Sequence, residues 1–292
     1  PTRTPASVVR QRPRGPISEI MQHDPSEAPP SLRDTTLTPF GPPATGSAWG
    51  KGPSTDDARR FLEGPQSRTA EFLRVCRITA EFIRGFRSLH FVGPCVTVFG
   101  SARFDENHRY YQLARDVGAR IAELGLTTIT GGGPGIMEAA NRGAKEAGGR
   151  SIGCNIVLPH EQRANPYVDR FIEFRYFFVR KVMLVKYSYG FVILPGGFGT
   201  LDELFEVATL VQTGKVENFP LILMGRDFWV PMLEFFRRRL VAGGTISPTD
   251  IDLISVTDSP DEAREILRTG IDASAARARA KPKRKWWLGE QR

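Results

Sequence analysis

The stretch Phe191-Val-Ile-Leu-Pro-Gly-Gly-Phe-Gly-Thr-Leu-Asp-Glu203 decides the fold of this chain. Its first four residues are all apolar, which is typical of a strand that is buried on both faces. Pro195 and the glycines after it break the strand and leave backbone amides that can point outward. A helix is predicted to start at Thr200, with Thr200 as its N-cap and Glu203 as the acid of a capping box. A strand, a glycine loop and a helix N-terminus form a usual phosphate site, where the Glu203 carboxylate is costly unless the chemistry uses it.

Short apolar runs alternate with amphipathic helical segments on both sides of this stretch. Strands are expected at residues 96–99, 126–130, 151–157, 170–174, 191–194, 221–224 and 253–256, and helices at 68–89, 107–124, 176–187, 229–240 and 261–267, with a further helix through Met137. This alternation predicts an α/β fold, a single doubly wound (Rossmann-like) parallel sheet with helices on both faces. The helix over 68–89 carries Phe82, Ile83 and Phe86 as an apolar stripe, which packs either on this domain or on a second copy of it.

Composition divides the 292 residues into three parts. Residues 1–65 hold 12 of the 22 prolines without sustained periodicity, so a disordered Pro-rich segment is predicted there. The Rossmann-like domain is expected over 66–270, and a basic C-terminal tail over 271–292. Seven basic residues and one acid fall within 275–292, so most of the net charge of +8 belongs to this tail. The body therefore offers no basic face, and nucleic acid is not expected as a partner.

Several classes of protein are excluded by what the sequence lacks. No apolar run approaches the roughly 18 residues of a membrane span, so no membrane partner is expected. The four histidines have no metal-ligand spacing, and no metal is predicted. The three cysteines are far apart and show no CxxC pair, which favours reduced thiols and a cytoplasmic location: Cys76, Cys95 and Cys154.

Three glycine-bearing loops follow predicted strands: Gly100-Ser101, Gly131 to Gly135, and Gly196 to Gly199. In a doubly wound sheet, ligands bind at the carboxyl ends of the strands, where the strand order reverses. None of the loops has the G-x-G-x-x-G pattern of dinucleotide sites or the Gly-Lys-Ser/Thr of a Walker A loop. A mononucleotide is therefore favoured over NAD or the hydrolysis of ATP, and no cofactor is expected.

The same residues resemble a known family. Pro195-Gly-Gly-Phe-Gly-Thr-Leu-Asp-Glu203 fits the signature PGGxGTxxE, and the pair Arg180-Lys181 stands fifteen residues before it. Together they resemble the Lonely Guy (LOG) family of cytokinin riboside 5′-monophosphate phosphoribohydrolases, and Gly131 to Met137 is similar to its GGG…G(L/I)M loop. The resemblance covers about Cys95 to Thr257. It implies release of a free base and ribose 5-phosphate from adenine-type nucleoside 5′-monophosphates by a homodimer or higher homo-oligomer.

The resemblance also implies roles for individual residues. Arg180 and Glu203 are similar to the catalytic pair of the family. The expected substrate contacts are Glu161, Lys181, Gly196, Gly197, Phe198, Gly199, Thr200, Leu201, Asp202 and Thr209, with Gly100, Ser101, Gly132 and Gly133 from the other loops. Two departures bear on the base that is recognised: Phe177-Phe178 replaces a common Met-His, and Glu138 stands where plant members have glycine.

The chemistry of these residue types agrees with that activity. Cleavage of an N-glycosidic bond passes through a ribosyl cation, which a carboxylate such as Glu203 can stabilise while it orients water. Arg180 offers a fixed fork of donors for phosphate or for Glu203. A helix cap for Glu203 and a solvated helix face for Arg180-Lys181 remain the structural alternatives. Two other functions also remain: a nucleotide or molybdenum-cofactor carrier, and a pyridoxal-phosphate decarboxylase that uses Lys181 or Lys186.

Overall fold

The computed structural model describes residues 64–157, 163–217 and 219–275, which all belong to one compact unit of the chain. The expected Pro-rich segment up to residue 63, the tail beyond residue 275 and Glu161 lie outside the described residues. In chain order the elements are α2 (Arg68–Leu89), β1 (Cys95–Phe99), α3 (Arg109–Glu123), β2 (Thr127–Thr130), α4 (Ile136–Glu146), β3 (Arg150–Ile156), β4 (Arg170–Phe174), α5 (Phe177–Tyr187), β5 (Ser188–Ile193), α6 (Phe198–Gln212), β6 (Leu221–Met224), α7 (Arg226–Phe235), the π-helix η3 (Phe236–Val241), α8 (Pro248–Ile251), β7 (Ile254–Thr257) and α9 (Pro260–Ala275).

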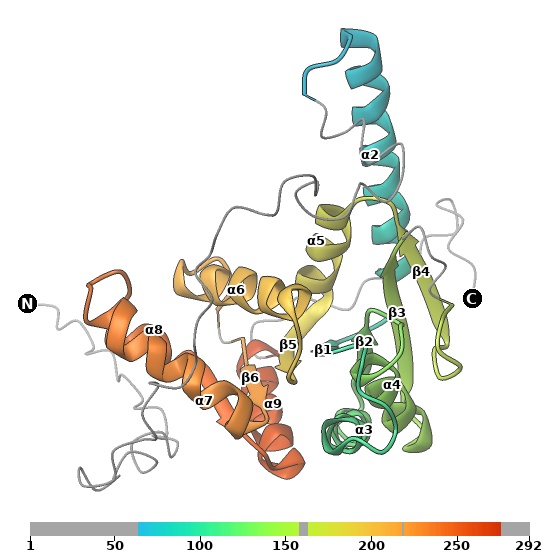
Figure 1. Ribbon diagram of the computed structural model, residues 1–292. Helices are drawn as coiled ribbons and strands as arrows, with labels where there is room; N and C mark the ends of the chain where they lie inside the picture. Colours follow the sequence, from blue (N-terminus) through green and yellow to red (C-terminus); the bar gives the residue numbers. More distant parts are fainter. Residues whose placement is uncertain (1–63, 158–162, 218, 276–292) are drawn as a thin grey trace, which may run out of the picture. The chain divides into compact units, whose positions relative to one another are not determined.

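The seven strands form one parallel sheet in the order β4-β3-β2-β1-β5-β6-β7 (Figure 1). The chain builds the sheet outward from β1 to β4 and then returns to place β5 on the other side of β1. Strand order therefore reverses between β1 and β5, and the loops after these two strands flank the crevice where such sheets bind ligands.

Alternating strand side chains supply a core on each face of the sheet. Phe99 and Phe191 point to the face covered by α2, α5, α6 and α7. Val98 and Val192 point to the face covered by α3, α4 and α9. The predicted doubly wound α/β sheet with helices on both faces is confirmed. Within the described ranges, no helix is long and apolar enough to cross a membrane.

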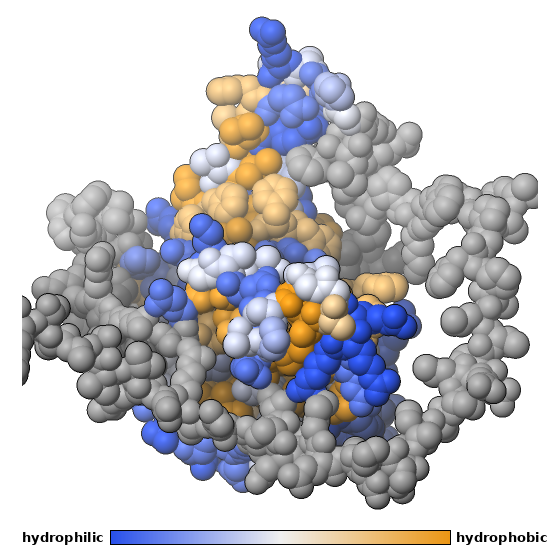
Figure 2. Space-filling model, turned by 90° about the vertical axis from the view of Figure 1, so that its left-hand side faces the viewer, coloured by the Kyte–Doolittle hydropathy of each residue, from blue (hydrophilic) through white to orange (hydrophobic). Residues whose placement is uncertain are grey.

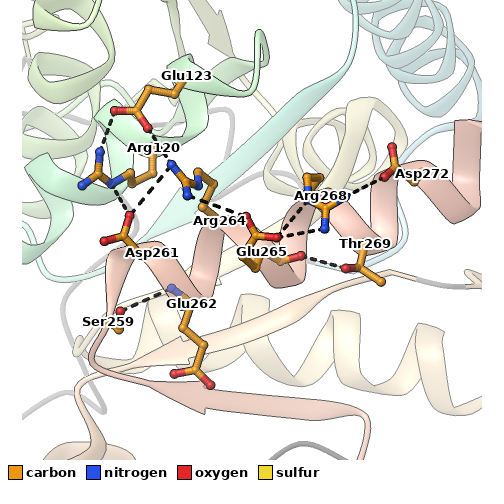
Figure 3. A network of polar contacts seen from close by, with 10 residues as sticks. All are labelled: Arg120, Glu123, Ser259, Asp261, Glu262, Arg264, Glu265, Arg268, Thr269 and Asp272. Carbon is orange, nitrogen blue, oxygen red and sulfur yellow. Dashed lines mark hydrogen bonds and ion pairs between the residues drawn. The ribbon is translucent and has the colours of Figure 1, made fainter. Parts of the chain in front are cut away.

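A network of charged side chains fastens α9 to the end of α3 (Figure 3). Arg264 of α9 reaches Glu123 at 3.2 Å, and Arg120 of α3 reaches Asp261 of α9 at 2.9 Å. Arg268 extends the network along α9 to Asp272 and Glu265. These side chains are one third to two thirds exposed, so their pairs are largely screened by solvent.

The start of α6 differs from the sequence prediction. The helix begins at Phe198 with Gly197 as its N-cap, and no side chain caps it. The carbonyl of Gly197 already accepts hydrogen bonds from the amides of Thr200 at 3.0 Å and Leu201 at 3.1 Å. The prediction that Thr200 caps the helix and that Glu203 completes a capping box was wrong, because the glycines tolerate an earlier helical turn. Glu203 therefore lies inside the helix and has no role as its cap.

Two other boundaries differ for identifiable reasons. β5 starts at Ser188 rather than Phe191, because the buried Ser188 hydroxyl pairs with Thr97 of β1 at 2.5 Å and lets a polar residue extend the strand. α9 continues to Ala275 rather than ending near Leu267, because Ile271 still packs on the second core.

The apolar stripe of α2 faces two ways. Phe82 and Phe86 are partly buried against the first core, so this part of the stripe packs on the domain itself. Ile83 is 54% exposed. Hydrophobic residues run along α2 and gather again below it in Figure 2, and the N-terminal half of the helix extends beyond α5 in Figure 1. Three further apolar residues of that half are more than half exposed: Phe72, Leu73 and Val75.

Candidate active site

The three glycine loops meet at the carboxyl edge of the sheet. The amide of Ser101, after β1, donates to the carbonyl of Pro195, after β5, at 3.0 Å. The amide of Ile136, at the start of α4, donates to the carbonyl of Ser101 at 3.0 Å. Gly135 has a φ of 71°, and an added Cβ there would lie 2.5 Å from the Ser101 carbonyl oxygen. The contact thus requires glycine, and it joins Gly100-Ser101 to both other loops.

The loop after β5 leaves room for a ligand at the N-terminus of α6. A Cβ built on Gly197 or Gly199 would meet no atom within 4 Å. Gly196 is different, because a Cβ there would lie 2.1 Å from the hydroxyl oxygen of Thr200. Phe198, between Gly197 and Gly199, is 92% exposed. The first amides of a helix have no acceptor within the helix, so an anion can bind them here.

Arg180 of α5 and Glu203 of α6 form a buried pair beside these loops. Their atoms Nη1 and Oε1 are 3.5 Å apart, and the side chains are 13% and 3% exposed. The Nε of Arg180 donates to the Cys154 carbonyl of β3 at 2.8 Å. Its Nη2 would lie 3.3 Å from a Cβ on Gly131, so the guanidinium also borders the loop after β2. Strands and helices far apart in the sequence thus hold one cation against one carboxylate.

The Glu203 carboxyl is poised to exchange a proton near neutral pH. Desolvation by burial raises its pKa to about 7, although the charges of Arg180 and Lys181 act in the opposite direction. Its Oε2 atom is buried and accepts no hydrogen bond from any described residue. A carboxylate so placed can stabilise positive charge or take a proton from water at working pH.

The other predicted contacts lie at different places around this pair. Lys181 bonds to Asp202 and Glu206, at 3.0 Å each. The side chain of Leu201 packs on the first core. Thr209 is exposed about three turns along α6, and its hydroxyl donates to the Phe205 carbonyl of its own helix at 2.7 Å. The structure therefore brings Asp202 and Lys181 to the edge of the pair but turns the hydroxyl of Thr209 to its own backbone.

Buried amides that sequence reasoning missed hold the loop after β2. The side chain of Asn165 donates from Nδ2 to the Gly133 carbonyl at 3.0 Å. The backbone amide of Asn165 donates to the Gly132 carbonyl at 2.9 Å. Asn141 of α4, fully buried, accepts at Oδ1 from Asn165 at 3.0 Å and from Thr130 at 2.7 Å. Asn141 has a signal in the sequence, because it is a polar residue on the apolar side of α4, whereas Asn165 lies in a loop and has none. Among the residues that the structure describes, no group of His, Cys, Asp and Glu could hold a metal ion.

Comparison with known proteins places this arrangement among relatives. Residues 137–267 match the family described as "Possible lysine decarboxylase". A cytokinin riboside 5′-monophosphate phosphoribohydrolase of Mycobacterium tuberculosis is 32% identical over 154 residues, 52% of this chain and 82% of the relative. An Arabidopsis thaliana protein of the same name is 29% identical over 176 residues, 59% of this chain and 80% of the relative.

Solved structures show a further similarity. The molybdenum cofactor carrier protein of Chlamydomonas reinhardtii is 27% identical, with a TM-score of 0.46, and the match covers 62% of this chain and 99% of that one. The signature from Pro195 to Glu203 and the mycobacterial relative, 82% of which is covered at 32% identity, identify the family. The chain belongs to the Lonely Guy (LOG) family.

Proposed function

We propose that the protein hydrolyses the N-glycosidic bond of adenine-type nucleoside 5′-monophosphates, giving the free base and ribose 5-phosphate. The observation that carries the proposal is Glu203. This buried carboxyl has a pKa of about 7, lies 3.5 Å from Arg180, and keeps one oxygen without a partner among the described residues. Because α6 begins earlier than expected, helix capping no longer accounts for this acid.

The geometry supports separate roles for the glycine loop before α6, which binds phosphate, and for the Arg180–Glu203 pair, which acts on the bond to the base. The 5′-phosphate binds the amides at the start of α6, beside Gly197 and Gly199, where no side chain stands in the way. This fixes the ribose near Glu203. As the bond from C1′ to the base nitrogen breaks, its electron pair leaves with the base, and the carboxylate of Glu203 stabilises the cationic sugar. Water then bonds to C1′ and gives up a proton to Glu203, while the base takes up a proton.

Arg180 interacts with both Glu203 and the 5′-phosphate in this mechanism. Its guanidinium holds a permanent charge at 3.5 Å from Glu203 and keeps the acid oriented. Its position beside Gly131 also allows it to meet the phosphate. Cytokinin riboside 5′-monophosphates are the proposed substrates, since the relatives carry that name.

The lysines do not support a decarboxylase, despite the family description. A Schiff base with pyridoxal phosphate needs a lysine in a shielded pocket. Lys181 is instead paired with two carboxylates, and Lys186 is exposed. Neither setting favours a neutral amine.

We also propose a homodimer or higher homo-oligomer in the cytoplasm. A monomer would leave Phe72, Val75 and Ile83 of α2 in water, each more than half exposed. The thiols of Cys95 and Cys154 are buried and unpaired, which suits a reducing compartment. Sedimentation at micromolar concentration tests the assembly, and a fully active monomer would contradict it.

A panel of nucleoside monophosphates tests the activity. The full-length protein is incubated in EDTA with each nucleotide and with the matching nucleoside, and free base is measured by chromatography. The monophosphates should be cleaved with a much higher kcat/KM than the nucleosides, because only they reach the amides of α6. Tight binding of a nucleotide without release of base would contradict the proposal and favour a carrier.

A further inference from the structure

The helix that carries Arg180 and Lys181 has no cap of its own. The N-cap residue of α5 is Tyr176, whose side chain makes no capping hydrogen bond, and its first turn contains no acidic residue. Arg180 is the fourth residue of this helix. The position of its guanidinium therefore depends directly on where the first turn of α5 lies.

A carboxylate from α2 holds the two residues that lead into this helix. Oε1 of Glu81 accepts a hydrogen bond from the amide of Arg175 at 2.6 Å, and Oε2 accepts one from the amide of Tyr176 at 3.2 Å. The side chain is only 8% exposed, and the guanidinium of Arg84 lies 3.7 Å from its Oε1. A negative charge here stands at the positive end of the α5 dipole, where it stabilises the helix terminus.

The rest of the contact between the two helices keeps Glu81 in register. A Cβ built on Gly85 of α2 would lie 3.0 Å from Sδ of Met183 in α5 and from a ring carbon of Phe174 in β4, so these two side chains pack directly against the α2 backbone. At the far end of α5, the hydroxyl of Tyr187 donates to the Phe86 carbonyl at 3.2 Å. α2 thus touches α5 at its start, middle and end, and at the start the contact is made by the carboxylate of Glu81.

We propose that Glu81 is a positioning residue for Arg180, acting through the backbone at the start of α5. It makes the C-terminal half of α2 part of the functional scaffold, although α2 lies outside the residues 137–267 that match the family. The inference rests on the proposed function for its catalytic consequence, but the anchoring of α5 can be measured without any activity.

The effect should be large because the Arg180–Glu203 contact is loose. Nη1 and Oε1 are 3.5 Å apart, which is already longer than a good hydrogen bond. A further displacement of the helix start would separate them, and misplacement by about 1 Å can cost up to about 100-fold in rate.

The test replaces Glu81 by alanine and by glutamine in the full chain. The matched control is Glu71→Ala on the same helix, where the acid pairs with Arg74 at 3.1 Å. Glu81→Ala should lower kcat about tenfold or more with little change in KM, since positioning and not substrate affinity is lost. Amide hydrogen exchange of residues 175–181 should speed up about tenfold, because the residues that lead into the first turn lose their anchor. Glu71→Ala should match the wild type in both measurements.

Glu81→Gln keeps the test possible if Glu81→Ala does not fold. It keeps the volume and one acceptor oxygen, so it should show a smaller change of the same kind in kcat and in exchange. Unchanged exchange in α5 would overturn the inference, whether seen in a folded Glu81→Ala or, if that variant does not fold, in Glu81→Gln. A fall in kcat together with a general loss of stability and unchanged exchange at 175–181 would also overturn it. A wild type that cleaves no nucleotide contradicts the proposed function instead, and faster exchange in the variant would then still support the anchoring.

Discussion

Two charged clusters of this molecule are built on opposite principles. Between α3 and α9, each arginine meets two or more carboxylates, and the side chains are one third to two thirds exposed. At the candidate site, one arginine meets one carboxylate at 3.5 Å, both almost fully buried, and Oε2 of Glu203 has no partner among the described residues. The exposed cluster costs little desolvation and adds little stability. The buried pair costs much, and such a cost is retained where the charge is used.

Replacing Glu203 by glutamine should have the largest effect. The variant keeps the size of the side chain but removes the charge that meets the ribosyl cation, so kcat should fall by a factor on the order of 100 or more. Nucleotide binding should persist, because the amides of α6 are unchanged. Glu265→Gln, in the exposed network, is the matched control and should leave kcat at the wild-type value. Normal turnover of a folded Glu203→Gln protein would show that the acid is not catalytic.

Arg180→Ala should have the second largest effect, and it should change KM as well as kcat. Loss of the guanidinium removes a group that meets both phosphate and Glu203, so KM should rise and kcat should fall, each by about tenfold. Arg180→Lys keeps the charge without the fork and should recover part of the loss. Steady-state kinetics with Arg268→Ala as the control separates this from a general effect of removing an arginine. A rise in KM alone would assign Arg180 to binding only.

The pKa of Glu203 links activity and stability with opposite signs. The ionised form is the active one, so kcat should rise with pH through about 7. The folded pKa is raised above the ordinary value of 4.5, so the stabilising contribution of this group is complete below pH 4.5 and is lost as pH rises through about 7. Between pH 4 and pH 8 the unfolding free energy of the wild type should fall by about 3 kcal/mol relative to Glu203→Gln.

Chemical denaturation of both proteins at several pH values measures this difference. A constant gap between their unfolding free energies would mean that the folded pKa of Glu203 is not raised. The kcat profile gives an independent check, because its acidic limb should disappear in the glutamine variant.

The smallest effect is expected in the exposed network. Arg264→Ala removes ion pairs to Glu123 and Asp261, and Tm should fall by about 3 °C or less. The difference should shrink further in 0.5 M salt, because exposed pairs are screened. Thermal melts at low and high salt measure it. A loss as large as that of a core substitution would show that the two clusters do not differ as described.

The fold could be predicted from the sequence because its signals are local. Apolar runs of four or five residues between amphipathic helices define a parallel sheet, and the glycines after them locate its ligand edge. The helical start at Phe198 could not be predicted, since Gly197 and Thr200 are both acceptable N-caps and only the folded loop selects between them. The partly buried state of Phe82 and Phe86 depends on contacts with α5, about 100 residues away, which periodicity does not report.

At the candidate site too, some residues could be predicted from the sequence and others could not. The signature residues Arg180 and Glu203 could be named from the sequence, and their pairing stayed a prediction until the geometry was known. Asn165 could not be found, because it lies in a loop, where nothing in the sequence distinguishes a buried amide from an exposed one. Glu81 was also missed in the sequence.

The strand order has a consequence for how the protein acquires activity during folding. β1 and β5 pair from Cys95 with Ser188 onward, so the two sides of the crevice are more than ninety residues apart in the chain. Contacts of such long range form slowly, because the intervening loop must close first. β2 to β4 can assemble on β1 before β5 arrives, but that half alone lacks Glu203 and the loop of Gly196 to Gly199. A chain emerging from the ribosome therefore has no competent site until β5 has docked, and recovery of activity on refolding should follow the pairing of β1 with β5 rather than the earlier gain of helix.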